Sequence, residues 1–178
     1  MGRIWEVEGI KKVKSTSNSE CVIRPFKAGD AGYVAYLHGR LYKDTYGFGT
    51  LFEYYVLKGL AEFIRNPDGG GLWVVEIEGK IIGSIAITKF NDTTAQLRWF
   101  ILDDAFQGEG LGHHLMKVAL EFCKAQTYQH VFLWTVNTLQ AARHLYKKFG
   151  FTLTEEKPNM EWTETELIEE RWDLDTGQ

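Results

Sequence analysis

A glycine-rich turn, Gln107-Gly108-Glu109-Gly110-Leu111-Gly112, constrains this chain more than any other feature of its sequence. It follows an apolar, β-prone run over 94–102 and precedes a segment whose apolar residues recur at helical spacing. Glycines at such a strand-to-helix turn allow positive φ and let a ligand approach the main chain. The first N–H groups of a helix have no intrahelical acceptor and form an anion site with the helix dipole. The segment is therefore either a phosphate-binding turn or a tight turn without a ligand.

Two familiar phosphate motifs differ from this turn. A P-loop has Lys followed by Ser or Thr after its last glycine, whereas His113 and His114 follow Gly112 here. The dinucleotide fingerprint is Gly-x-Gly-x-x-Gly in an early βαβ unit, whereas these glycines are spaced by two and lie late in the chain. A nucleoside triphosphatase and a dinucleotide-dependent enzyme are therefore not indicated.

The hydrophobic periodicity predicts one α/β domain over residues 20–178, preceded by a polar extension over 1–19 that reads as a loop or frayed arm. The order of elements indicates a mixed central sheet of about six to seven strands with helices on both faces. The expected strands are 21–25, 72–77, 81–90, 94–102, 130–136, 151–153 and 167–174, and the expected helices are 28–44, 51–65, one from 111, and 139–149.

Tyr146 lies in the last full turn of the helix expected over 139–149, four residues before Gly150. If a pyrophosphate lies at the glycine turn, this neighbouring helix would aim the phenol at a thioester sulfur. A neutral tyrosine there would protonate a leaving thiolate as a general acid. Taken alone, the segment fits a boundary aromatic with a hydrated hydroxyl equally well.

Together, these two segments resemble the GNAT (Gcn5-related N-acetyltransferase) family. Its coenzyme A signature, Gln/Arg-x-x-Gly-x-Gly/Ala, is matched by Gln107, Gly110 and Gly112, and its later Leu-Tyr-x-x-x-Gly-Phe is matched by 145–151. The resemblance covers roughly residues 20 to 175. The segments 133–135, 141–142 and 170–174 are similar to the acetyltransferase half of bacterial proteins that fuse it to a MarR-type DNA-binding half.

The resemblance implies an N-acetyltransferase that moves an acetyl group from acetyl-CoA directly to a primary amine on a small molecule or peptide. Tyr146 would be its catalytic acid. Main-chain groups at the end of the third central strand would pair with the pantetheine arm, and those of the glycine turn would hold the pyrophosphate. The implied cofactor-binding residues are Phe100, Ile101, Leu102, Gln107, Gly108, Glu109, Gly110, Leu111 and Gly112.

Two positions depart from the family pattern. Leu139 stands where many members have a cofactor-contacting Asn, and we expect the nearby Asn137 to cap the following helix in a capping box with Gln140. Gln96 stands where some members have a glutamate base, and an amide cannot accept a proton at neutral pH. The base is then elsewhere, with Glu76 as a weak candidate, or a water chain, or unnecessary. A non-catalytic acyl-CoA sensor or an interaction module remains the alternative.

Composition and charge exclude several classes of protein. The net charge is −4, which gives no basic face for nucleic acid. No run of about 20 apolar residues and no signal peptide is present, so we expect a cytoplasmic protein without a membrane span. Cys21 and Cys123 form no disulfide framework, and the histidines show no spacing that would bind a metal.

Aromatic residues gather between Phe26 and Phe63. They are explained either by two helices packing on a core or by the walls of a substrate pocket. Tyr42, Tyr46 and Tyr54 in a mildly acidic chain suit a cationic amine through cation–π contacts. The identity of the acceptor, and the choice between monomer and homodimer, stay open.

Overall fold

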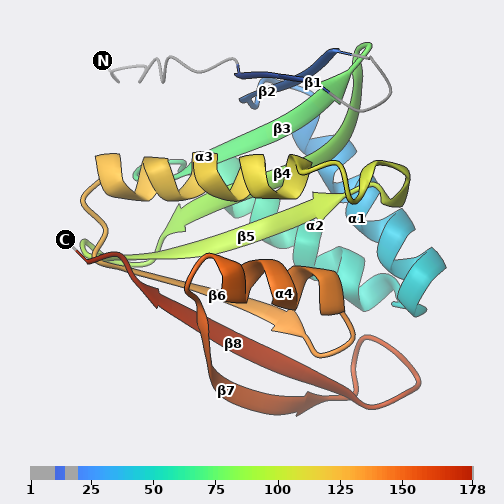
Figure 1. Cartoon of the computed structure of the whole chain (residues 1–178). Helices are drawn as coiled ribbons and strands as arrows, with labels where there is room; N and C mark the ends of the chain where they lie inside the picture. Colours follow the sequence, from blue (N-terminus) through green and yellow to red (C-terminus); the bar gives the residue numbers. More distant parts are fainter. Residues whose placement is uncertain (1–10, 15–19, 178) are drawn as a thin grey trace.

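The computed structural model describes residues 11–14 and 20–177, which form a single mixed sheet flanked by helices (Figure 1). Within these residues the sheet has eight strands in the order β1-β2-β3-β4-β5-β6-β8-β7. Only the β5–β6 pair is parallel. The strands are β1 (Lys11–Lys14), β2 (Glu20–Pro25), β3 (Gly71–Ile77), β4 (Lys80–Lys89), β5 (Thr94–Leu102), β6 (His130–Val136), β7 (Thr152–Asn159) and β8 (Leu167–Asp175).

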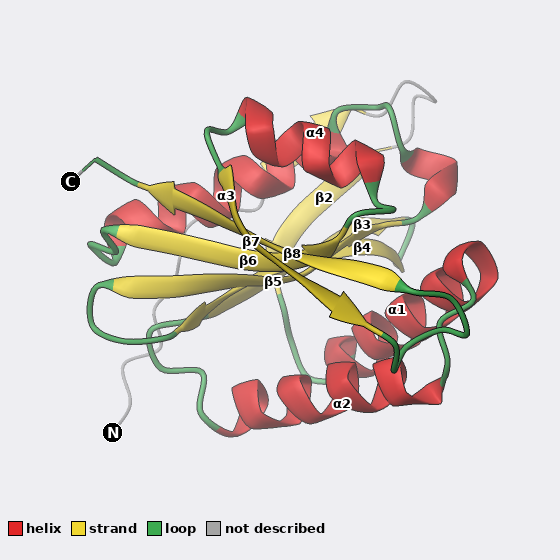
Figure 2. Cartoon of the chain, turned by 90° about the horizontal axis from the view of Figure 1, so that it is seen from below, coloured by secondary structure: helices red, strands yellow, loops and turns green. Residues whose placement is uncertain are grey.

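Four helices cover the two faces of the sheet. Figure 2 shows α1 (Asp30–Tyr46) and α2 (Thr50–Arg65) on one face, with α3 (Leu111–Ala125) and α4 (Gln140–Lys148) on the other. A short 3₁₀ turn, η1 (Asp104–Phe106), links β5 to the glycine turn. The predicted α/β architecture with helices on both faces is therefore confirmed.

The strand β1 lies within the segment that the sequence analysis interpreted as a polar extension. Its backbone pairs antiparallel with β2, Lys11 opposite Ile23 and Lys14 opposite Glu20. A four-residue strand with Val13 as its one apolar residue is too short for period-two alternation to appear in the sequence. The rest of the extension, 1–10 and 15–19, lies outside the described residues.

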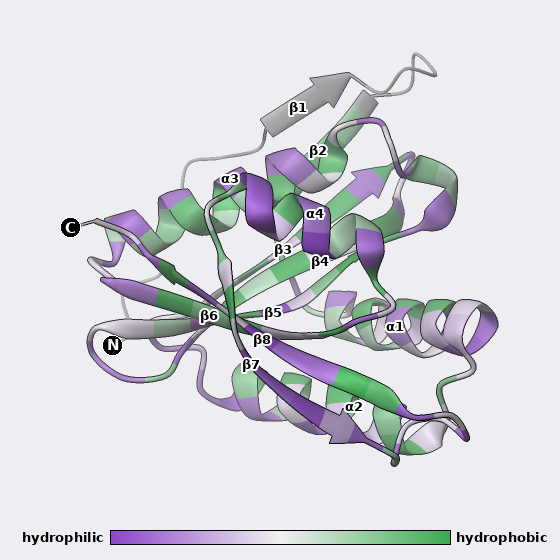
Figure 3. Ribbon diagram, turned by 60° about the horizontal axis from the view of Figure 1, so that its bottom comes forward, coloured by the Kyte–Doolittle hydropathy of each residue, from purple (hydrophilic) through white to green (hydrophobic). Residues whose placement is uncertain are grey.

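Each face of the sheet has its own hydrophobic core. The side chains of β5 alternate between the two, because successive residues of a strand point to opposite faces. Leu97 packs in the core under α3 and α4, whereas Trp99, two residues further on, packs in the core under α1 and α2, because a bulge at this point of β5 reverses the alternation. The central strand β4 is buried on both faces over most of its length. The edge strand β7, by contrast, is exposed and largely hydrophilic (Figure 3).

The two parallel strands separate partway along their length. Pairing between β5 and β6 ends at Leu97 opposite Leu133, and Figure 1 shows the strands diverging beyond this point. A bulge bends β5 here, because Ile101 faces Ser84 while Arg98 faces Ala86, so that β5 holds one extra residue. Trp99 within the bulge has φ 45°, and its carbonyl accepts a hydrogen bond of 2.7 Å from Ser84 Oγ. Within the described part of the chain, the edge of residues 98–102 that faces β6 therefore has no strand partner.

Candidate active site

A cavity of about 550 Å³ opens at the divergence of β5 and β6, which we call the glycine-turn cavity. It lies between the end of β5, the turn before α3, the helix α4 and the end of α1. Most of the residues implied by the coenzyme A signature meet here. The lining includes Phe100, Ile101, Leu102, Gln107, Gly108, Gly110, Gly112, Tyr42, Tyr46, His113, Leu139, Leu145, Tyr146 and Lys148.

The glycine turn is shaped to receive a ligand. Gly108 and Gly110 both have φ +81°, and a Cβ on either would meet no atom within 4 Å. Gly110 is the N-cap of α3 and provides no side-chain cap, so the first N–H groups of the helix remain available to an anion. Gly112 serves packing instead, because its Cβ would lie 3.4 Å from Leu145 Cδ2. These features fit a pyrophosphate held by main-chain groups.

Three other predicted residues contribute differently. Gln107 braces the turn, since its Nε2 donates to Asp104 Oδ1 at 2.6 Å and to the Leu102 carbonyl at 3.4 Å. Leu111 is fully buried in the core, so only its main chain faces the turn. Glu109 is half-buried, and its side chain is not part of the cavity lining.

A second cavity of about 200 Å³, which we call the aromatic cavity, lies on the α1–α2 side of the same divergence. Phe48, Phe52 and Trp162 form its densest wall, with ring centroids 4.9–5.8 Å apart. Among the described residues, the charged side chains of its lining are Arg98 and Glu169. The lining also includes His38, Tyr42, Tyr55, Gln96, Trp99, Phe100, Trp134, Thr135, Leu139 and Tyr146.

Tyr146 lines both cavities, together with Tyr42, Phe100 and Leu139. It is 4% exposed, and the rings of Phe151, Trp172 and Phe100 surround it at centroid distances of 6.0–6.2 Å. Burial raises the pKa of its hydroxyl well above the usual value, and the Thr135 hydroxyl beside it acts weakly in the opposite direction. The phenol is therefore neutral at physiological pH and stands at the junction of the two cavities.

Glu76 is not a base in this site. Its carboxylate accepts hydrogen bonds from Arg24 Nε at 2.8 Å and Nη2 at 2.6 Å, and it lines neither cavity. Gln96, by contrast, does line the aromatic cavity. The carboxylates of Asp103 and Asp104 also have partners, because Asp103 pairs with Arg40 at 2.8 Å and Asp104 accepts from Gln107.

His38 is a site residue that the sequence analysis did not single out. Its Nδ1 lies 2.8 Å from the Val34 carbonyl, and because a carbonyl only accepts, Nδ1 carries the proton. Burial lowers the pKa of His38 to about 4, so the ring is neutral and Nε2 is an acceptor. Its spacing of four from Tyr42 on α1, which puts both residues on one helix face, is the signal that could have revealed it.

The predicted capping box at α4 is wrong. The helix begins at Gln140, with Leu139 as an N-cap that makes no side-chain hydrogen bond. Asn137 Oδ1 instead accepts from the Ile168 N–H of β8 at 3.3 Å, and Gln140 Nε2 donates to the Asn137 carbonyl at 2.8 Å. The amide of Asn137 therefore joins β6 to β8, because the neighbouring strand offers an N–H that sequence spacing does not reveal.

The aromatic segment is divided between the site and the surface. Tyr42 lines both cavities and Tyr46 the glycine-turn cavity, whereas Tyr54 is 52% exposed and lines neither. Core packing explains Phe63, which lies in the core under α1 and α2. A cavity wall explains Tyr42 and Tyr46, whereas Tyr54 fits neither interpretation. Trp162, from the loop between β7 and β8, carried no signal in the sequence.

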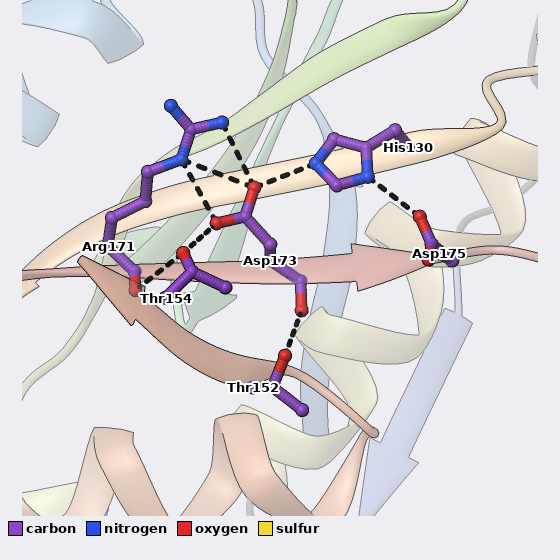
Figure 4. Close-up of polar contacts among 6 residues, drawn as sticks. All are labelled: His130, Thr152, Thr154, Arg171, Asp173 and Asp175. Atoms are coloured by element: carbon purple, nitrogen blue, oxygen red, sulfur yellow. Dashed lines mark hydrogen bonds and ion pairs between the residues drawn. The ribbon is translucent and has the colours of Figure 1, made fainter.

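A separate polar cluster joins β6, β7 and β8 away from these cavities (Figure 4). His130 lies 2.7 Å from Asp173 and 2.9 Å from Asp175, and Arg171 and Thr154 also contact Asp173. The charged groups of this cluster are paired with one another, which is typical of a structural network. Among the residues that the structure describes, no three His, Cys, Asp or Glu gather as metal ligands, and no helix is long and apolar enough to cross a membrane.

Solved structures share this fold. The N-acetyltransferase from Staphylococcus aureus Mu50 has a TM-score of 0.73 and 19% identity, covering 89% of this chain and 99% of that one. The structure of yncA from Salmonella typhimurium, with its cofactor acetyl-CoA, has a TM-score of 0.68 and 17% identity, covering 89% and 95%. At these identities the likeness concerns the fold.

Curated relatives match about half of the chain. N-acetylaspartate synthetase from Danio rerio is 31% identical over 90 residues, which is 50% of this chain and 32% of that protein. N-acetyltransferase 8B from Homo sapiens is 32% identical over 91 residues, which is 48% and 40%. The chain thus spans about a third to two fifths of their length. The model of the Acetyltransferase (GNAT) family matches residues 37–151, more than half of the sequence. This chain therefore belongs to the GNAT family of acetyltransferases.

Proposed function

We propose that this protein is an acetyl-CoA-dependent N-acetyltransferase that moves the acetyl group directly to a primary amine. The observation that carries the proposal is the meeting of two cavities at the divergence of β5 and β6, with Tyr146 in the lining of both. The larger cavity suits a long ligand with a pyrophosphate at the glycine turn. The smaller one suits an acceptor that arrives from the opposite face of the sheet.

In this reaction acetyl-CoA supplies the activated acyl group as a thioester. The free edge of Phe100, Ile101 and Leu102 would bind the pantetheine arm as an added strand, and the turn from Gln107 to Gly112 would bind the pyrophosphate. A main-chain N–H near Ile101 or Leu102 would stabilise the negative charge that develops on the carbonyl oxygen. Most of the acceleration would come from holding the two substrates in contact.

Tyr146 would act on the leaving group. The amine nitrogen forms a bond to the carbonyl carbon, the C–S bond breaks, and the sulfur takes the proton of the Tyr146 hydroxyl. The proton released by the amine nitrogen returns to the tyrosine oxygen through water, so the enzyme ends unchanged. The high pKa of Tyr146 keeps the hydroxyl protonated until charge develops on the sulfur.

His38 would orient the acceptor through a hydrogen bond and would not act as the base that takes the proton of the amine. Its neutral Nε2 can accept a hydrogen bond from the amine, while a pKa of about 4 makes imidazolium unfavourable at neutral pH. Gln96 in the lining is not a base, and Glu76 is held by Arg24. The carboxylate of Glu169 is already bound by Asn159 at 2.7 Å, so the described lining offers no free base. The acceptor would therefore react as the free amine.

The first test is a calorimetric titration of the protein with acetyl-CoA, followed by release of CoA thiol with a panel of amines. Gly110→Trp should abolish binding, because the side chain would fill the open space at the turn. Gly79→Trp is the matched control, since Gly79 also has a positive φ, 80°, with no atom within 4 Å, but lies in the β3–β4 hairpin. Loss of acetyl-CoA binding in both variants would contradict the proposal, and so would the absence of acetyl-CoA binding in the wild type.

One rival function has a specific observation in its favour. The lack of a strong base in the aromatic cavity also suits a non-catalytic acyl-CoA sensor. Acetyl-CoA binding without thiol release for any amine would support that rival. A cytoplasmic location, a monomer or homodimer, and the finer likeness to MarR–GNAT fusion proteins stay predictions.

A further inference from the structure

The aromatic cavity contains a cation that no carboxylate neutralises. Arg98 lies in the lining, half-buried, and among the described residues its guanidinium forms no ion pair and no hydrogen bond. Glu62, on the exposed side of α2, attracts it only from beyond ion-pair distance. Desolvation is the main effect on the guanidinium and lowers its pKa. A cation in such surroundings is costly unless a ligand compensates it.

The other partly buried arginines of the described chain behave differently. Arg24 pairs with Asp30 and Glu76 at 2.6 Å each. The remaining three pairs follow the same rule: Arg40 with Asp103 at 2.8 Å, Arg143 with Glu170 at 2.9 Å, and Arg171 with Asp173 at 3.0 Å. Arg98 is therefore an exception within its own protein, and the exception lies in the cavity where the acceptor would bind.

The fold holds Arg98 in place without neutralising it. The bulge in β5 brings its guanidinium over the ring of Trp99, with Cζ 4.5 Å from the ring centroid. Gly59 on α2 leaves room for it, because a Cβ there would lie 2.6 Å from Nη2. Stacking on an aromatic face fixes the plane of a guanidinium and leaves its N–H groups free to bind.

The other charged side chain of the cavity is already balanced. Glu169 accepts a hydrogen bond of 2.7 Å from Asn159 Nδ2 and lies 3.8 Å from Lys157 Nζ. The unmatched charge of the cavity is therefore positive. This argues against the simple cationic amine that the tyrosines alone suggested.

We propose that Arg98 binds a carboxylate of the acceptor, so that the substrate class is an amino acid. The fork of N–H donors of a guanidinium matches the two oxygens of a carboxylate. With that end fixed, the amine would extend toward Tyr146 at the junction of the cavities. Rings from Phe48, Phe52 and Trp162 would contact an apolar side chain. The inference rests on the proposed acetyl transfer and adds to it the chemical class of the acceptor.

The test compares leucine, methionine and phenylalanine with their decarboxylated amines as acceptors, by CoA thiol release. The wild type should prefer each amino acid. Arg98→Gln should raise KM for the amino acids about 10- to 100-fold, the usual loss for a hydrogen-bonded charge pair, with kcat and the KM of the amines little changed. Arg98→Lys should recover part of the loss. Arg65→Gln, an exposed arginine at the end of α2, is the control and should change nothing.

Binding measurements separate the two proposals. The same acceptors are titrated into the protein saturated with CoA. Amino-acid binding that depends on Arg98, without any thiol release, would support the carboxylate site and contradict acetyl transfer. Equal binding or turnover of amino acids and amines in the wild type would overturn the carboxylate site and leave acetyl transfer standing. An equal loss for both ligand classes in Arg98→Gln would also overturn it, with circular dichroism checking that the variant is folded.

Discussion

At the residue scale, Tyr146 shows how one side chain can be both a packing residue and a chemical group. Phe151 and Trp172 pack against its ring, and burial keeps its hydroxyl protonated, while the residue lines both cavities. The sequence motif around Tyr146 predicted its role through resemblance. The geometry adds the reason that the phenol is fixed in one orientation.

Tyr146→Phe should lower kcat about 10²-fold, within the usual range for loss of a general acid. The KM for acetyl-CoA should change little, because the ring and its packing remain. Tyr128→Phe is a matched control, since it removes another buried phenol, which donates to the Gly69 carbonyl at 2.6 Å far from the cavities. Steady-state thiol release measures both variants, and full activity in Tyr146→Phe would disprove the acid assignment.

At the same scale, Arg98 is a residue whose role could not be predicted from the sequence alone. Gln96 and Arg98 are two residues apart on the strand predicted over 94–102, and alternate residues of a regular strand share a face. The sequence did not show to which side of the sheet Arg98 points or whether a carboxylate lies beside it. Both depend on helices that are distant from Arg98 in the sequence. Nothing in the sequence indicated that Gly59 would leave room for the guanidinium or that Trp99 would stack against it.

At the element scale, the divergence of β5 and β6 creates the site. The strand over 94–102 and the glycine turn were predictable from hydrophobic periodicity and from glycine spacing. The bulge was not, because it places a tryptophan at φ 45°, a conformation for which the sequence offers no glycine or asparagine. The residues of the coenzyme A signature could therefore be named from the sequence, whereas His38, Arg98 and Trp162, and the division of the site into two cavities, could not.

The strands β6 and β8 are also joined by charge, which gives a pH-dependent contribution to stability. Burial opposes protonation of His130, but hydrogen bonds to Asp175 and Asp173 outweigh it and raise its pKa. Because the folded pKa lies above the unfolded one, the stabilisation is complete below about pH 6.5 and is lost as pH rises through the raised value.

His130→Gln should therefore cost stability at pH 6 and cost less at pH 9. The difference should be about 0.5–1 kcal/mol, since His130 is partly exposed to solvent and screened by it. Urea unfolding of wild type and variant at the two pH values measures it, with the exposed His144→Gln as control. A cost that is the same at both pH values would show that protonated His130 contributes nothing.

At the scale of the whole molecule, the sheet would keep the two substrates of the proposed reaction apart until they meet at Tyr146. One cavity opens toward the glycine turn before α3, and the other lies under α1 and α2. The two cysteines line neither cavity, and burial raises the pKa of both thiols, that of Cys123 to about 12. No thiolate is therefore available in the described site to carry the acetyl group between them.

Initial rates should therefore give intersecting double-reciprocal lines when both substrates are varied, as expected for a ternary complex. Cys123→Ala should keep turnover close to that of the wild type. Mass spectrometry of the protein mixed with acetyl-CoA alone should find no acetylated intermediate. Parallel lines, or an acetyl group on the enzyme that an amine can remove, would contradict direct transfer.

The end of β5 that has no strand partner would recognise the two substrates in two different ways. Phe100, Ile101 and Leu102 would bind coenzyme A through main-chain groups, which do not depend on the type of side chain, while the side chains of Arg98 and Trp99 would face the acceptor. Substitutions in this stretch can therefore alter the acceptor without giving up the cofactor. A strand that recognises one substrate through its main chain and another through its side chains would allow acceptor specificity to evolve without loss of cofactor binding.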